Sequence, residues 1–216
     1  TEMGLTVEEV DKLTGPVIGR PKSANFRTCD VVGLDTLVHV ANGVKDNCPN
    51  DEANAVFTIP TYINKMVENK WLGSKTKQGF FKKVTGENGK SEILTLDLNT
   101  LEYRVGEKVK FATLEMAKTI DDLKLRTKAL VKGQDKAGEF YRKSFFGLFG
   151  YVSNRIPEIT DAIYKIDDAL SAGFGWQLGP FATWDAIGVE ESLPYMEKMG
   201  ITPNAWIKEM LAAGIK

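Results

Sequence analysis

The sequence has few cysteines and no long apolar run, and each shortage excludes a class of protein. Cys29 and Cys48 are too few for a disulfide framework and lack the spacing of metal ligands; we expect Cys29 to pack and Cys48 to lie in a loop. No apolar run approaches the roughly 20 residues of a membrane helix, and the N-terminus lacks the layout of a signal peptide. The sequence therefore predicts a cytoplasmic protein.

Neither sign of charge is in excess, since 28 Lys and Arg oppose 29 Asp and Glu. These charges are interspersed, whereas a nucleic-acid-binding surface needs a basic stripe, so no nucleic-acid partner is expected. With 216 residues and 43% hydrophobic content, the chain can build one sizeable core or two small ones. Because the sequence starts at Thr1 rather than Met, we expect it to be a piece of a longer protein.

Histidine occurs once, so most catalytic motifs that use histidine as a general base are absent. On the helix expected around it, His39 faces Asp35, and such a pair could transfer protons. No nucleophile or metal partner lies at a useful spacing, so a surface histidine is the favoured interpretation. The glycines of 173–179 resemble a dinucleotide loop but have the wrong spacing and follow a helix rather than a strand.

One stretch of the chain occurs twice, at 15–33 and 173–188, each copy after a short helix-like run. In both copies a helix ends, a Gly/Pro-rich turn reverses the chain, and an aromatic residue opens a second helix. A single insertion separates the registers. The aligned pairs are Asp11 with Asp167, Gly19 with Gly175, Phe26 with Phe181, Thr28 with Thr183, Asp30 with Asp185 and Gly33 with Gly188. The spacing is too long for a solenoid, so we interpret the chain as two copies of one helical unit.

Hydrophobic periodicity predicts a mainly α protein. The expected helices span 7 to about 14, 26 to about 45, 62 to about 70, 111 to about 131, 135 to about 152, 157 to about 171 and 189–199, with a last one opening at Pro203 after Thr202 as N-cap. Thr6 and Glu9 form the pattern of a capping box for the first helix. Alternation around the glycine-rich turn 85–90 predicts one small β-hairpin.

Three further groups have both a structural and a functional interpretation. The Lys, Ser and Thr residues of 71–81 could hold an anion such as a CoA phosphate, although a solvated turn is favoured. Asp30 and Asp185 suit the positive end of a helix dipole, which favours a structural role. An acyl pocket could be lined by three aromatic residues, Trp176, Phe181 and Trp184. Aromatic residues at this spacing more often fill a core, however.

At 10–35 and 71–81 the residues resemble the C-terminal domain of the L-3-hydroxyacyl-CoA dehydrogenase family. That family has a Gly-x-Pro-x-Gly-Pro-Phe-x-x-x-Asp-x-x-Gly-Leu-Asp pattern followed by Leu-Gly-x-Lys-x-Gly-x-Gly-Phe-Tyr. The stretch 178–188 is similar to the first pattern as well. Two copies in tandem resemble the multifunctional fatty-acid β-oxidation proteins, where the second copy takes the place of a partner subunit.

The resemblance implies two tandem, pseudo-symmetric helical domains like the C-terminal domain of 6-phosphogluconate dehydrogenase. We expect a first repeat at 1–84 lacking its first helix, a β-hairpin connector at 85–110 and a second repeat at 111–216. The family oxidises (3S)-3-hydroxyacyl-CoA to 3-oxoacyl-CoA with NAD, using a His-Glu pair of a separate Rossmann domain. No catalytic, cofactor or metal ligand is therefore expected here, and the isolated chain should be inactive. An acyl-CoA substrate, the Rossmann domain and a fused enoyl-CoA hydratase domain are the implied partners.

For the acyl-CoA cleft, the resemblance implies one short segment, composed of Gly19, Arg20, Pro21, Ser23, Asn25 and Phe26. The family also has an Asn-Arg step near the substrate carbonyl, which falls at Asn154 in the second copy and before Thr1 in the first, so Asn154 is expected to be a relic. Departures from the family are the polar turn at Ser23 and Asn25 and the ending Gln78-Gly79-Phe80-Phe81. The alternatives are a non-catalytic helical assembly module and, more weakly, a dehydrogenase of another hydroxy acid.

Overall fold

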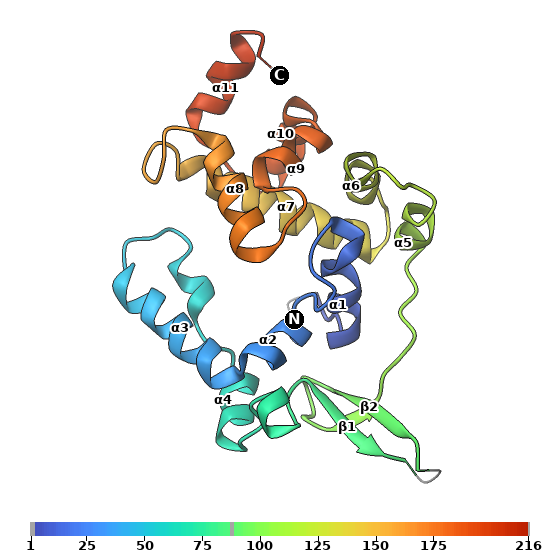
Figure 1. Ribbon diagram of the computed structural model, residues 1–216. Helices are drawn as coiled ribbons and strands as arrows, with labels where there is room; N and C mark the ends of the chain where they lie inside the picture. The colour runs from blue at the N-terminus through green and yellow to red at the C-terminus, as the bar shows by residue number, and fades with distance from the viewer. Residues whose placement is uncertain (1–2, 87–88, 216) are drawn as a thin grey trace. The chain divides into compact units, whose positions relative to one another are not determined.

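The computed structural model describes residues 3–86 and 89–215, which fold into two compact units (Figure 1). Unit 1 contains Thr1–Gly15 and Ser23–Val109, and unit 2 contains Pro16–Lys22 and Lys110–Lys216. Residues 85–110, expected as a connector, thus fall almost wholly within unit 1. The segment Pro16–Lys22, expected in the first repeat, packs with unit 2.

Unit 1 begins with helix α1 (Val7–Thr14), which confirms the predicted capping box. The Thr6 hydroxyl accepts the Glu9 N–H, and the Glu9 carboxylate accepts the Thr6 N–H at 2.8 Å. The helix buries Val7, Val10 and Leu13 and ends before Gly15.

The single helix expected from Phe26 to Lys45 is wrong, because the chain breaks at Gly33. There α2 (Phe26–Val32) ends and α3 (Leu34–Asn47) begins, with Gly33 at φ +100°, a conformation that costs a side-chain-bearing residue energy. A short 3₁₀ turn (Asn54–Phe57) and α4 (Thr61–Glu68) follow, with Pro60 at the N-cap.

Strands β1 (Phe81–Thr85), β2 (Ser91–Leu96) and β3 (Tyr103–Val105) form an antiparallel sheet in sequence order. The predicted hairpin is confirmed, with Lys83 opposite Ile93 and Thr85 opposite Ser91. Sequence patterning missed β3, because three residues are too short to show alternation. The expected hairpin turn includes residues 87–88, which lie outside the described residues.

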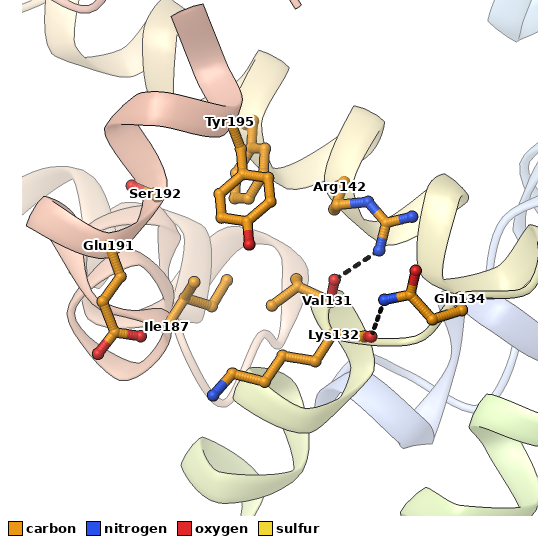
Figure 2. A pocket seen from close by; sticks show the side chains of 9 residues that line it. Val131, Lys132, Gln134, Arg142, Ile187, Glu191, Ser192 and Tyr195 are labelled. Atoms are coloured by element: carbon orange, nitrogen blue, oxygen red, sulfur yellow. Dashed lines mark hydrogen bonds between the residues drawn. The ribbon is translucent and has the colours of Figure 1, made fainter. Parts of the chain in front are cut away.

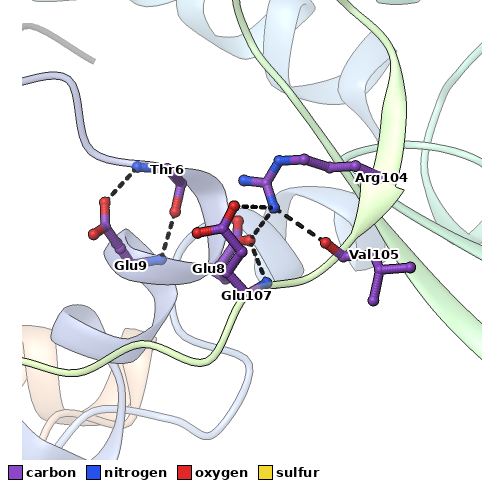
Figure 3. Close-up of polar contacts among 6 residues, drawn as sticks. All are labelled: Thr6, Glu8, Glu9, Arg104, Val105 and Glu107. Carbon is purple, nitrogen blue, oxygen red and sulfur yellow. Dashed lines mark hydrogen bonds and ion pairs between the residues drawn. The ribbon is translucent and has the colours of Figure 1, made fainter.

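An ion-pair network joins α1 to β3 within unit 1 (Figure 3). The Arg104 guanidinium lies 2.7 Å from the Glu8 carboxylate, which also accepts the Glu107 N–H at 3.0 Å. Burial alone would raise the pKa of Glu8, but the N–H of Glu107 and the Arg104 guanidinium outweigh it and lower that pKa. The third strand is thereby tied to the first helix.

Among its described residues, unit 2 contains helices joined by loops, and no strand. Its helices are α5 (Ala112–Ala117), α6 (Leu123–Val131), α7 (Lys136–Asn154), α8 (Ile163–Phe174), α9 (Pro180–Ile187), α10 (Val189–Lys198) and α11 (Ala205–Ala212). The predicted helix 111–131 is wrong, since Asp122 caps a separate α6 by accepting the Leu125 N–H. The last helix is capped by Asn204 rather than Thr202, because the Asn204 side chain accepts the Trp206 N–H.

Aromatic side chains of α7 and α9 form the core of unit 2. Phe149 stacks on Trp184 with ring centroids 5.0 Å apart, and Tyr141 stacks on Phe145 at 5.8 Å. The Trp184 indole N–H donates to the Ser192 hydroxyl at 2.7 Å, which satisfies its polar atom in the interior. The structural interpretation of Phe181 and Trp184 holds, since both are buried.

The helix predicted at 157 to about 171 corresponds to α8, and none of its residues is buried. Ile163 and Tyr164 are 39% and 60% exposed, and Phe174 is 66% exposed. The observed helix begins at Ile163, so Ile159 precedes it. Among residues 3–86 and 89–215, no helix has both the length and the apolar character to cross a membrane.

Candidate functional site

Carboxylates cap the second helix of each repeated stretch in the same way. Asp11 of α1 accepts the backbone N–H groups of Asn25, Phe26 and Arg27 at 2.6–3.1 Å. Asp167 of α8 accepts those of Phe181 and Ala182 at 2.9 and 2.8 Å. The two aligned aspartates therefore have one structural role, which holds each Gly-rich turn between its helices.

These caps bear on whether the chain could hold a dinucleotide. Helix N-termini bind phosphate through free N–H groups, and at α2 and α9 these groups already serve carboxylates. A Cβ on Gly179 would lie 2.4 Å from the Asp167 Cα, so this glycine permits helix packing rather than approach of a ligand. At these two helix N-termini, therefore, the described residues do not fit the phosphates of NAD.

The first half of the predicted acyl-CoA segment belongs to unit 2. Gly19 is buried at φ +70°, and a Cβ there would lie 2.5 Å from a Leu123 methyl carbon. Its carbonyl accepts the Gln177 N–H at 2.9 Å, and the Val17 carbonyl accepts the Arg126 Nε at 2.8 Å. Two glycine-rich turns that align in the sequence therefore contact each other within one unit.

Arg20 lies against the second of these turns, with its guanidinium carbon 3.6 Å from the centroid of the Trp176 ring. Burial lowers the pKa of Arg20 to about 10, since the charged form loses solvation there. The guanidinium stays protonated at neutral pH. Trp176 is thus a platform for a cation.

The second half of the segment belongs to unit 1. Phe26 is buried against Phe80, with ring centroids 4.5 Å apart, and forms part of the core. Ser23 accepts the Thr28 hydroxyl at 2.8 Å, and the Asn25 side chain is exposed. Of the six predicted residues, therefore, Phe26 has an established packing role and Asn25 is open to solvent.

The 71–81 motif has a structural explanation around Asp30. The Asp30 carboxylate is 1% exposed and accepts the N–H groups of Phe80 and Phe81 at 2.8 and 2.9 Å. A Cβ on Gly73 would lie 2.3 Å from the Asp30 carbonyl oxygen, and one on Gly79 would meet its carboxylate. Both glycines are required for this close approach.

Lys75, the lysine of the same motif, pairs with Asp35 of α3 at 2.6 Å on the surface. This removes Asp35 from the suggested proton-transfer pair, and His39 is exposed. Asp185, the counterpart of Asp30, is exposed as a whole residue, but partial burial of its carboxylate and the nearby Asp167 charge raise its pKa. Nothing in these groups resembles an acid-base pair.

Asn154 is the last residue of α7 and is half-buried. Its neighbours hold the end of the helix: the Ser153 hydroxyl accepts the Asn204 N–H at 2.9 Å, and Arg155 pairs with Glu158 at 2.9 Å. The Ser153-Asn154-Arg155 step thus lies at a helix end packed on the segment before α11.

A cavity of about 540 Å³ in unit 2, which the sequence did not predict, lies among α6, α7, α9 and α10 (Figure 2). Several of its polar groups have partners. Arg142 donates to the Val131 and Gly133 carbonyls at 2.7 and 2.6 Å, and Glu191 pairs with Lys128 at 3.0 Å. Ser192 donates to the Val189 carbonyl. The Glu191 carboxylate beside Ser192 also lines the cavity, and its pair with Lys128 lowers its pKa.

Comparison with known proteins agrees with the sequence resemblance. Residues 1–83 match the 3-hydroxyacyl-CoA dehydrogenase C-terminal domain. A Bacillus subtilis (strain 168) protein named "Probable 3-hydroxyacyl-CoA dehydrogenase" is 47% identical over 211 residues, covering 98% of this chain and 26% of that protein. A Deinococcus radiodurans protein of the same name is 44% identical over 92 residues, covering 43% of this chain and 26% of its own length.

A third relative comes from Rickettsia felis and is named "Putative fatty acid oxidation complex trifunctional enzyme". It is 25% identical over 173 residues, covering 80% of this chain and 22% of that protein. The chain spans about a quarter of the length of the curated relatives it matches. By these matches, and as its motifs predicted, the chain belongs to the 3-hydroxyacyl-CoA dehydrogenase family and contains that family's C-terminal domain.

Proposed function

We propose that this chain is the substrate-binding and pseudo-dimerisation region of an NAD-dependent 3-hydroxyacyl-CoA dehydrogenase of fatty-acid β-oxidation. The whole enzyme oxidises (3S)-3-hydroxyacyl-CoA to 3-oxoacyl-CoA in the cytoplasm. NAD and the catalytic His-Glu pair belong to a Rossmann domain outside this chain, and a fused enoyl-CoA hydratase domain is a further partner. The match to the Bacillus subtilis relative over 98% of the chain carries the proposal.

The proposed tandem organisation is supported by the paired helix caps. Asp11 and Asp167 hold the same kind of turn although they are 156 residues apart, and the Gly19 carbonyl accepts the Gln177 N–H of the other turn. Contact between equivalent segments is what a two-fold arrangement produces. We infer that the second repeat stands in for a partner subunit and that Asn154 is a relic of the family position.

The proposed acyl-CoA segment is Gly19, Arg20, Pro21, Ser23, Asn25 and Phe26. Buried Gly19 and Phe26 fix the backbone, and Arg20 supplies a cation. Ser23 and Asn25 supply the polar turn that departs from the family pattern. In this proposal the segment lines part of the acyl-CoA cleft, which the Rossmann domain completes.

Substitutions in the full-length enzyme test this segment. Ser23→Ala and Asn25→Ala each remove a polar group from the substrate side, so we expect KM for acetoacetyl-CoA to rise about three- to tenfold while KM for NADH stays unchanged. Asn42→Ala, at an exposed position of α3, is the matched control. Equal KM values for the wild type and all three variants would contradict the assignment of the segment.

The rival function is a non-catalytic helical assembly module. The exposed apolar side chains of α8 favour it, because such residues mark surfaces that other proteins cover. If the chain were an assembly module, it would bind the rest of the protein, and substitutions in its Gly-rich turns would leave KM for acetoacetyl-CoA unchanged.

A further inference from the structure

A second cavity, of about 490 Å³, lies in unit 1 beside the hairpin and combines cations with hydroxyl groups. We call it the hairpin groove. Its lining consists of Arg27, Ser74, Lys77, Phe81, Lys83, Val84, Thr85, Ser91 and Ile93. Three cations and three hydroxyls thus line one concave surface, and the described lining contains no carboxylate.

The strand register places Lys83, Thr85 and Ser91 on one face of the hairpin. Lys83 pairs with Ile93 and Thr85 with Ser91, and paired residues of an antiparallel sheet point to the same side. Lys82 points to the other face, where its ammonium lies 5.3 Å from the Tyr103 ring centroid. The positive charge of the groove therefore depends on which lysines face it, and not on a generally high lysine content of the hairpin.

Lys77 reaches the groove from a strained backbone. It adopts the left-handed conformation at φ 60° and ψ 13°, which favours glycine. The family pattern Leu-Gly-x-Lys-x-Gly-x-Gly-Phe-Tyr has a glycine at this position. Backbone strain that a glycine would relieve, but that the protein retains, is typical of functional positions.

The two lysines of the groove are available to an anion. Among the described residues, no ion pair holds Lys77 or Lys83, whereas the neighbouring Lys75 is paired with Asp35. Cations and hydroxyls around one concavity are the groups that bind phosphate oxygens.

We propose that the hairpin groove binds the phosphorylated nucleotide end of a ligand, with Arg27, Lys77 and Lys83 on the phosphates. The half-buried Phe81 and the 64% exposed Ile93 add an apolar surface suited to a purine. Given the proposed function, on which this identification rests, the ligand is the adenosine 3′,5′-bisphosphate part of coenzyme A. The segment Gly19–Phe26 ends one residue before Arg27.

Calorimetric titration of the chain tests the proposal with four probes: adenosine 3′,5′-bisphosphate, coenzyme A, 3′-dephospho-coenzyme A and adenosine. We expect binding of the first two, weaker binding of dephospho-coenzyme A and none of adenosine. Lys83→Gln and Lys77→Gly should each weaken bisphosphate binding about three- to fivefold, as loss of one exposed charge pair does. Raising NaCl from 50 to 300 mM should weaken it further.

Lys82→Gln is the matched control, since it removes the same charge from the adjacent residue on the opposite face, and it should leave binding unchanged. Lys77→Gly should also raise the urea midpoint by relieving strain, so its weaker binding could not be attributed to misfolding. The proposal would be overturned if Lys82→Gln weakened bisphosphate binding as much as the groove variants do, or if neither groove variant weakened it. So would failure of the bisphosphate to bind.

Failure of the groove and failure of the proposed function give different results. If the full-length enzyme oxidises NADH with acetoacetyl-CoA and the groove variants keep the wild-type KM, the groove proposal fails and the function stands. If bisphosphate binding depends on Lys77 and Lys83 but no hydride transfer occurs, the phosphate site stands and the dehydrogenase assignment fails.

Discussion

Glu8 shows how one buried carboxylate links two parts of unit 1. Its side chain is 13% exposed and binds both Arg104 and the Glu107 N–H, so the ionised form is favoured in the folded state. Folding therefore lowers its pKa from the usual 4.5. A carboxylate with a lowered pKa stabilises the fold above its unfolded pKa and loses this effect as the pH falls through its folded pKa.

We predict that Glu8→Gln lowers the free energy of unfolding by about 1 kcal/mol at pH 6. The difference from wild type should shrink as the pH falls below 4.5 through the lowered folded pKa, because protonation makes Glu8 neutral like the glutamine. Urea unfolding at pH 6, 4.5 and 3 measures it, with Glu102→Gln as an exposed control. A difference that stays constant across this range would show that charge is not the cause.

Single-residue roles were harder to predict than motifs. The sequence marked Asp11 and Asp30 by their repetition, but not what they bind, because their partners are backbone groups 14–16 and 50–51 residues away. The groove itself could not be predicted, since it depends on which hairpin face meets α2.

At the scale of elements, helix-capping residues and helix-breaking residues set the ends of the helices. The capping box at Thr6 was readable because both partners lie within four residues. The breaks at Gly33 and before Asp122 were missed because apolar spacing continues across them, and periodicity cannot detect a change in chain direction. Helix α8 has apolar residues at helical spacing, but none of them is buried.

The paired caps give a prediction for two elements at once. Asp11→Ala should free three N–H groups of α2, and Asp167→Ala two of α9, each costing about 1 to 2 kcal/mol. Because the caps lie in different units, the double variant should lose the sum. Thermal and urea unfolding followed by circular dichroism measure these losses.

Asp168→Ala is the matched control for the second cap, since this neighbour of Asp167 is exposed. It should unfold like the wild type. A loss in Asp168→Ala equal to that in Asp167→Ala would mean that negative charge on α8, not the cap, supports α9.

For the whole molecule, the sequence predicted a mainly α chain with one small β element and its family, and both were confirmed. The division into units was harder to predict, because Pro16–Lys22 lies within the expected first repeat by sequence but belongs to unit 2. Sequence order cannot reveal such an exchange, which depends on contacts such as that between Arg20 and Trp176.

The most direct test of the central claim is NADH consumption with acetoacetyl-CoA, comparing the chain alone, the Rossmann domain alone and the two joined in the full-length enzyme. We predict activity only in the joined protein, because the proposed function assigns the His-Glu pair and NAD to one part and the substrate-binding segment to the other. Activity of the chain alone would contradict the account, as would inactivity of a folded full-length protein.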